Sequence, residues 1–293
     1  MANKNKLDFS TISLKESFEK SKVSLLKLTE KNSEEIQKFG KSSVSNALQI
    51  AIGGTIFAMT LTIGQLFQGM VRISASTPFG IPNTFGLLTV AGASLLAVKS
   101  SELTRKAFDT SSLALPRKVS LPFLSSNEGG IALLGTIIYK SLGGDFKGIS
   151  PSRIDNLGAF SRFKASLPAT LLYATSEERA VINKLGNFYG CHTCGRKDGV
   201  SFIADHMPPL KYAKRSNGRL WRRLTGLKVI QRFYPQCKPC SNIQAQIVRA
   251  DSRYLKFHHF PTLHTYHFAG FLLVAGVICL RDYQRERGKR KGK

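Results

Sequence analysis

Residues 191–242 contain three short motifs in sequence: Cys191-His-Thr-Cys194, Asp205-His206 and Cys237-Lys-Pro-Cys240-Ser-Asn242. A C-x-x-C turn lets two thiolates point at one ion, and two such turns supply the four tetrahedral ligands that a structural zinc prefers. We therefore expect Cys191, Cys194, Cys237 and Cys240 to hold one zinc. The alternative is two disulfides or a pair of redox motifs, which this spacing favours less than a metal.

Thiols used in this way indicate a reducing compartment. The fifth cysteine, Cys279, lies alone in an apolar run, where we expect it to act as a small buried hydrophobic residue.

The segments around the cysteines predict two strands and a helix. Alternating side chains over residues 200–204 predict a strand that ends at Asp205 and His206, and residues 231–234 predict a second strand. Ser241 is expected to cap the following helix, which would place Asn242 beside the first strand.

The order of these residues resembles the HNH or His-Me finger nucleases, most closely their endonuclease VII-like zinc-binding branch, over about residues 185–260. The resemblance implies a zinc-stapled ββα-metal, treble-clef-like unit with a second, catalytic ion, Mg²⁺ or Mn²⁺. Asp205 and Asn242 would hold that ion, and His206 would be the general base that activates water. In this branch the Asn usually follows the last cysteine directly, whereas here Ser241 intervenes.

Basic residues dominate the charge of the chain. Its 293 residues include 43 Lys and Arg against 18 Asp and Glu, a net charge of +25, which favours nucleic acid or an acidic lipid surface as partner. The loop between His206 and Cys237 has no acidic residue, and it predicts a phosphate-backbone clamp in which Trp221 offers a stacking surface. A lipid-facing or ribosomal-type basic loop is the alternative. The basic residues of this loop are Lys211, Lys214, Arg215, Arg219, Arg222, Arg223, Lys228 and Arg232.

Three apolar segments predict attachment to a lipid bilayer. Residues 42–98 form two uncharged runs around Arg72, separated by a Pro/Gly cluster, and are long enough for a transmembrane helical hairpin. A buried hairpin in a soluble core is the alternative. Residues 261–280 are a further apolar helix followed by a basic tail, 281–293, which is typical of a membrane anchor. One hairpin plus one anchor would place the two basic tails on opposite sides of the membrane.

The remaining segments carry less information. Residues 1–41 are polar and amphipathic and resemble neither a secretory signal nor a transit peptide. Residues 99–184 are a basic mixed helical region whose apolar run, 130–139, is too short to span a bilayer. His258, His259, His264 and His267 are expected to be interfacial polar residues rather than a second metal site.

The fold class expected from the sequence is α+β: a predominantly helical, membrane-associated chain that carries one small zinc module, residues 185–260. Two functions follow from these patterns. The first is a membrane-anchored, metal-dependent endonuclease. The second is a catalytically inactive zinc-binding module in an accessory or structural subunit of a membrane or nucleic-acid assembly.

Overall fold

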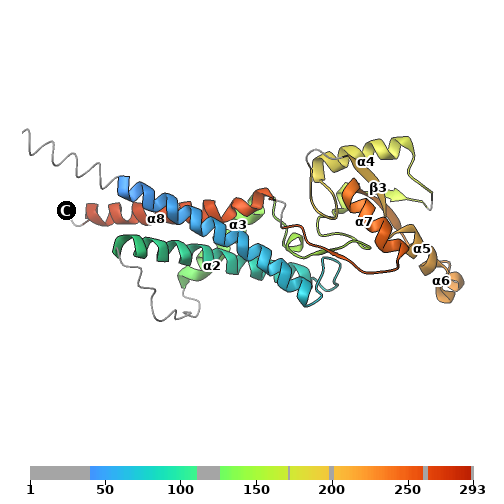
Figure 1. Cartoon of the computed structure of the whole chain (residues 1–293), viewed down its shortest axis with the longest axis horizontal. Coiled ribbons are helices and arrows are strands. Elements are labelled where there is room, and N and C mark those ends of the chain that lie inside the picture. Colours follow the sequence, from blue (N-terminus) through green and yellow to red (C-terminus); the bar gives the residue numbers. More distant parts are fainter. Residues whose placement is uncertain (1–39, 111–125, 171, 198–200, 260–262, 292–293) are drawn as a thin grey trace, which may run out of the picture.

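The computed structural model describes residues 40–110, 126–170, 172–197, 201–259 and 263–291 (Figure 1). The predicted N-terminal segment 1–41 lies almost wholly outside the described residues. The described chain forms an elongated bundle of helices with the predicted zinc module at one end, so the α+β class and the mostly helical character are confirmed.

Four helices make the bundle: Gly40–Met70, α2 (Ile81–Thr110), α3 (Ser126–Ser141) and α8 (Ala269–Lys291). Large side chains from all four meet in one apolar core that includes Phe57, Val90, Tyr139 and Leu273. Three helical segments are long and apolar enough to cross a membrane: Gly40–Met70, Ile81–Phe108 and Thr265–Arg290.

Neighbouring helices run antiparallel at close contacts made by glycines. A Cβ on Gly53 would meet the backbone of Ala97, and one on Gly64 would meet Thr89, so Gly40–Met70 runs opposite to α2. The same helix meets α8 through the close approach of Gly54 to Phe271 and of Gly270 to Phe57, again in opposite directions.

The helix α3 is the fourth helix of the bundle. Its presence changes the predicted positions of the two ends of the chain. Glu128 pairs with Lys99 at 3.1 Å while Gly135 lies against Ser94, so α3 runs antiparallel to α2. The three predicted segments would leave the two tails at opposite ends. With α3 included, Gly40 and the end of α8 lie at the same end of the bundle, and the zinc module lies at the other (Figure 1).

A buried polar layer joins the bundle to the module. The amide oxygen of Gln65 accepts hydrogen bonds from the backbone N–H groups of His258 and His259, at 3.0 and 3.1 Å. The Nε2 atoms of the same two histidines lie 3.0 Å from the Ser150 carbonyl and 3.2 Å from the Gly148 carbonyl. These hydrogen bonds hold the bundle and the module together, and both histidine rings are buried at the junction.

The module is built on two small antiparallel sheets. One has the order β2 (Leu167–Ala169), β4 (Gln231–Cys237), β3 (Phe202–Met207), and the other pairs β1 (Ser152–Arg153) with β5 (Leu255–Lys256). The helices of the module are α4 (Ser176–Tyr189), α5 (Leu210–Asn217), α6 (Leu220–Thr225) and α7 (Lys238–Arg249). Short 3-10 turns occur at Phe146–Ile149 (η1), Phe163–Ala165 (η2) and Thr265–Phe268 (η3).

Several details differ from the sequence prediction. Asp205 and His206 lie inside β3, which continues to Met207, and α2 continues beyond residue 98 to Thr110. The N-cap of α7 is Cys237, so the prediction that Ser241 caps this helix is wrong. Cys279 is exposed on α8 rather than buried. The strands β1 and β2 come from the region 99–184 and extend the module beyond its predicted start.

Candidate metal centre and basic groove

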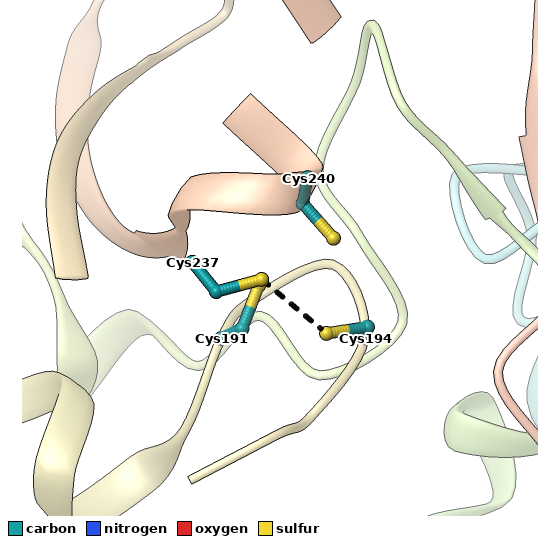
Figure 2. A group of neighbouring side chains, drawn as sticks. All are labelled: Cys191, Cys194, Cys237 and Cys240. Atoms are coloured by element: carbon teal, nitrogen blue, oxygen red, sulfur yellow. Dashed lines mark hydrogen bonds between the residues drawn. The ribbon is translucent and has the colours of Figure 1, made fainter. Parts of the chain in front are cut away.

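The sulfur atoms of Cys191, Cys194, Cys237 and Cys240 converge on one point (Figure 2). All four side chains are buried, and their Sγ atoms lie within 4.8 Å of one another. The Cys194 and Cys237 sulfurs are 3.7 Å apart. Zinc–sulfur bonds of about 2.3 Å in tetrahedral geometry place neighbouring sulfurs about 3.8 Å apart, so the cluster has the size of a four-thiolate zinc site. All four cysteines are free, which excludes the two-disulfide alternative in this structure.

Local backbone geometry explains how the cysteines meet. Gly195 has φ +75°, which lets the chain turn back after Cys194, and its N–H donates to the carbonyl of Cys191 at 2.8 Å. The end of β4 brings Cys237 and the first turn of α7 brings Cys240. The four cysteines therefore come from a turn, a strand and a helix start, and a metal bound by them would join these three parts.

The four thiols perturb one another's pKa values. Hydrogen bonding from Cys191 lowers the pKa of the Cys237 thiol, whereas burial raises the pKa of the Cys191 thiol. The donor set of four soft sulfurs fits zinc.

Asp205 lies on the α7 side of the three-stranded sheet, inside a layer of polar side chains. The Nε2 atom of Gln244 donates to Asp205 Oδ1 at 2.8 Å, and His192 Nε2 lies 3.3 Å from Asp205 Oδ2. The N–H of Gly158 donates to His192 Nδ1 at 3.4 Å, so Nε2 carries the hydrogen that faces the carboxylate. Both oxygens of Asp205 are therefore engaged by protein donors.

His206 follows Asp205 in the strand and faces the opposite side of the sheet, because side chains alternate along β3. Its Nε2 atom lies 3.0 Å from the Leu172 carbonyl and 3.2 Å from the Thr170 carbonyl, so Nε2 is the donor. The ring is 7% exposed and packs edge-on against Phe233, with centroids 4.5 Å apart.

Asn242 is exposed on α7 and makes no side-chain hydrogen bond to a described residue, while Gln244 takes the position next to Asp205. The structure therefore does not bring Asp205, His206 and Asn242 together around one ion. Within the described residues, the four cysteines are the single cluster of metal-type side chains.

A groove lined by arginines runs along the flank of the module. It combines a cavity of about 480 Å³ beside the loop after residue 70 with one of about 670 Å³ beside α5, and Arg153 and Arg253 line both. The hydroxyl-bearing residues Ser74, Ser76 and Thr77 line the first cavity. The arginines of the groove are Arg72, Arg153, Arg215, Arg219, Arg222 and Arg253.

Two carboxylates also line this groove, and each is paired. Asp155 bonds to Arg153, and Asp251 pairs with Arg215 at 2.9 Å. No described carboxylate pairs with Arg72, Arg219, Arg222 or Arg253. The groove therefore carries an excess of positive charge that no described side chain neutralises.

The residues predicted to bind phosphate divide into three groups. Arg215, Arg219 and Arg222 line the groove, and the guanidinium of Arg222 lies 4.6 Å from the centre of the half-exposed Trp221 ring. Lys211 instead donates to the Val248 carbonyl at the end of α7, and Arg232 donates to Ser166. The others, Lys214, Arg223 and Lys228, are exposed outside the groove lining.

Arg72, Arg153 and Arg253 were missing from the predicted set. Each is isolated in the sequence, and only the pairing of β1 with β5 and the position of the loop after residue 70 bring them together.

Comparison with protein families, curated proteins and solved structures finds no match. The functional assignment therefore rests on the geometry of the cysteine cluster, the groove and the helical bundle.

Proposed function

We propose that this chain is a membrane-anchored, zinc-stapled binding subunit that holds the sugar-phosphate backbone of nucleic acid without cleaving it. The observation that carries this proposal is the groove with six arginines and two paired carboxylates. Phosphate contacts of this kind give affinity with little sequence preference.

The zinc has a structural part in this proposal. It fixes the turn 191–195, the end of β4 and the start of α7, and the following residues, Asp251 to Leu255, return along the groove. Loss of zinc would therefore disturb the groove indirectly, through the position of α7 and β5.

The polar contacts of Asp205 and His206 favour binding over catalysis. A metal-dependent nuclease needs carboxylate or amide oxygens around one ion and a base that reaches a water beside it. Here Asp205 is hydrogen-bonded within the module, and the buried ring of His206 lies across the sheet from it. The endonuclease function has no comparable support in the geometry.

The membrane part of the proposal rests on the three long apolar helical segments. Many of their large side chains face outward, including Met59, Ile63 and Leu88, each more than half exposed. A bilayer would cover these side chains, whereas water would not. The module then lies beyond one end of these apolar segments, and the start of Gly40–Met70 and the end of α8 lie at the other end.

The test is equilibrium binding of fluorescent single-stranded RNA and duplex DNA to the full chain in a mild detergent, over a series of salt concentrations. Arg219→Gln and Arg253→Gln should each weaken binding several-fold and reduce the slope of log K against log salt by about one. Both arginines are exposed and unpaired with described carboxylates, so the substitutions should leave the fold intact.

The matched control is Lys184→Gln, which removes one exposed positive charge from α4, outside the groove. Its affinity should stay within about twofold of the wild type, since a single charge far from the ligand is largely screened. Equal losses in all three variants would show a general charge effect and contradict the groove assignment.

A further inference from the structure

The end of the bundle where Gly40–Met70 begins contains a pocket of about 260 Å³ between three helices. It is formed where Gly40–Met70 begins, near the end of α2, and along the last turns of α8. It lies at the opposite end of the bundle from the zinc module and shares no residue with the arginine groove. Its lining includes Lys41, Ser45, Gln49, Arg105, Arg281 and Arg285.

Positive charge is concentrated in this pocket. Lys41, Arg105, Arg281 and Arg285 line it, and Asp282 is the carboxylate of the lining. Arg281 Nε lies 3.8 Å from Asp282 Oδ1, which is beyond hydrogen-bond range, and this buried Nε has no hydrogen-bond partner among the described residues. Four cationic side chains and one carboxylate therefore meet in this pocket from three helices.

The floor of the pocket contains a buried amide with an unused acceptor. Gln49 is 0% exposed, and its Nε2 donates to the carbonyl and hydroxyl oxygens of Ser45, at 3.2 and 3.1 Å. Its Oε1 atom has no hydrogen-bond partner among the described residues. A buried acceptor of this kind costs free energy unless a donor reaches it, and a hydroxyl group on a ligand can supply that donor.

We infer that this pocket binds the headgroup of an anionic phospholipid, with the phosphate on the arginines and a headgroup hydroxyl on Gln49. The inference rests on the membrane part of the proposed function, because the pocket lies where three apolar helical segments begin or end. Basic pockets between transmembrane helices are suited to such headgroups.

Apolar side chains beside the pocket favour a lipid over a free phosphate. Val44, Leu48 and Leu103 lie on the helical turns that line the pocket and are exposed. They offer a surface to acyl chains directly next to the cationic site. Inorganic phosphate would use the arginines alone.

The test measures thermal stabilisation of the full chain in a nonionic detergent by short-chain phosphatidylglycerol, phosphatidylcholine and inorganic phosphate, each titrated separately. Phosphatidylglycerol should raise the melting temperature at concentrations at which the other two have little effect. Arg105→Gln combined with Arg285→Gln should weaken its apparent affinity about tenfold or more, since each charge-assisted hydrogen bond contributes strongly.

The matched control, Arg287→Gln combined with Arg290→Gln, removes the same charge from exposed positions of α8 outside the pocket. It should leave the affinity within about twofold, because exposed charges at a distance are screened. A second variant, Gln49→Leu, should lower the affinity for phosphatidylglycerol while leaving the salt sensitivity of binding unchanged.

Equal stabilisation by inorganic phosphate would overturn the assignment to a lipid. Stabilisation by phosphatidylcholine to the same extent, or an equal loss in the Arg287/Arg290 control, would overturn the site itself. These variants lie outside the groove, so nucleic-acid binding should persist in all of them. If the wild type itself does not bind nucleic acid, that result would instead contradict the proposed function.

Discussion

At the residue scale, the carboxylate of Asp205 depends on the amide of Gln244. Their hydrogen bond, 2.8 Å long, lies in a mostly buried polar layer in which the Gln244 oxygen also accepts from Gln236. The nearby Asn242 is exposed on the same helix. A rotation of about 100° per residue places side chains two positions apart on nearly opposite faces of a helix.

We therefore predict that Gln244→Leu destabilises the module by about 1–3 kcal/mol, because it leaves buried polar groups without a partner. Asn242→Ala should change the free energy of unfolding by less than about 0.5 kcal/mol. Urea unfolding followed by fluorescence of Trp221, the single tryptophan of the chain, checks both variants. A larger loss for Asn242→Ala than for Gln244→Leu would contradict the polar layer described here.

The buried ring of His258 makes the junction sensitive to acid. Desolvation, together with the nearby His264 and Lys256, lowers the pKa of His258 to about 3. In the unfolded chain this pKa is about 6.5, so between these values the unfolded state binds the proton that the folded state excludes. Stability should therefore fall as the pH decreases from about 6.5 towards 3.

The measurement is the thermal stability of the wild type and His258→Asn in detergent between pH 7.5 and 4.5. The difference between the two proteins gives the part of the pH dependence that His258 causes. The variant should be less stable at pH 7.5 and should lose less stability on acidification than the wild type. A parallel loss in both proteins would show that groups other than His258 control the acid response.

At the scale of elements, the contact between α2 and η1 fixes where the chain leaves the bundle for the module. Gly86 lies against the backbone of Phe146, and a Cβ at this position would overlap the Phe146 carbonyl oxygen. Gly92 lies six residues further along α2, and a Cβ added there would meet no atom within 4 Å.

Gly86→Ala should destabilise the bundle, because backbone atoms cannot move away as a flexible side chain can. Gly92→Ala should be neutral or stabilising by up to about 1 kcal/mol, the usual gain in helix propensity. Thermal unfolding followed by circular dichroism in detergent compares the two. A stable Gly86→Ala protein would show that α2 and η1 do not pack as described.

The four-cysteine cluster allows a comparison of two cysteine variants, one inside the cluster and one outside it. Cys240→Ser should lose the bound zinc and expose the amides of β4 and α7 to hydrogen exchange, because the metal ties both to the turn at 191–195. Cys279→Ser, on the exposed face of α8, should retain one zinc per chain and wild-type exchange. Metal analysis of both proteins checks this, and zinc retained by Cys240→Ser would exclude the four-cysteine site.

At the scale of the whole molecule, the sequence predicted the parts better than their assembly. Cysteine spacing predicted the four-cysteine cluster, because the two cysteines of each C-x-x-C pair are close in sequence. Apolar length marked the long helices for a similar reason. The sequence did not predict that α3 belongs to the bundle, because its apolar run is short. Its apolar side chains are buried by packing against α2 and α8.

The site was less predictable for two physical reasons. The groove is assembled from arginines that are distant in sequence, such as Arg72 and Arg253, and no local pattern reports such tertiary contacts. The helix α7 begins at Lys238 rather than after Ser241. The residue at which α7 begins decides which of its side chains faces Asp205. The sequence motif alone does not predict that residue.

We propose that the chain binds nucleic acid without cutting it. The most direct measurement incubates the full chain with labelled single-stranded RNA and supercoiled plasmid in Mg²⁺ or Mn²⁺, and follows binding and strand integrity in the same sample. We predict bound, intact strands for both the wild type and His206→Ala. Cleavage by the wild type that disappears in His206→Ala, with zinc content unchanged, would contradict the claim and assign His206 as a catalytic base.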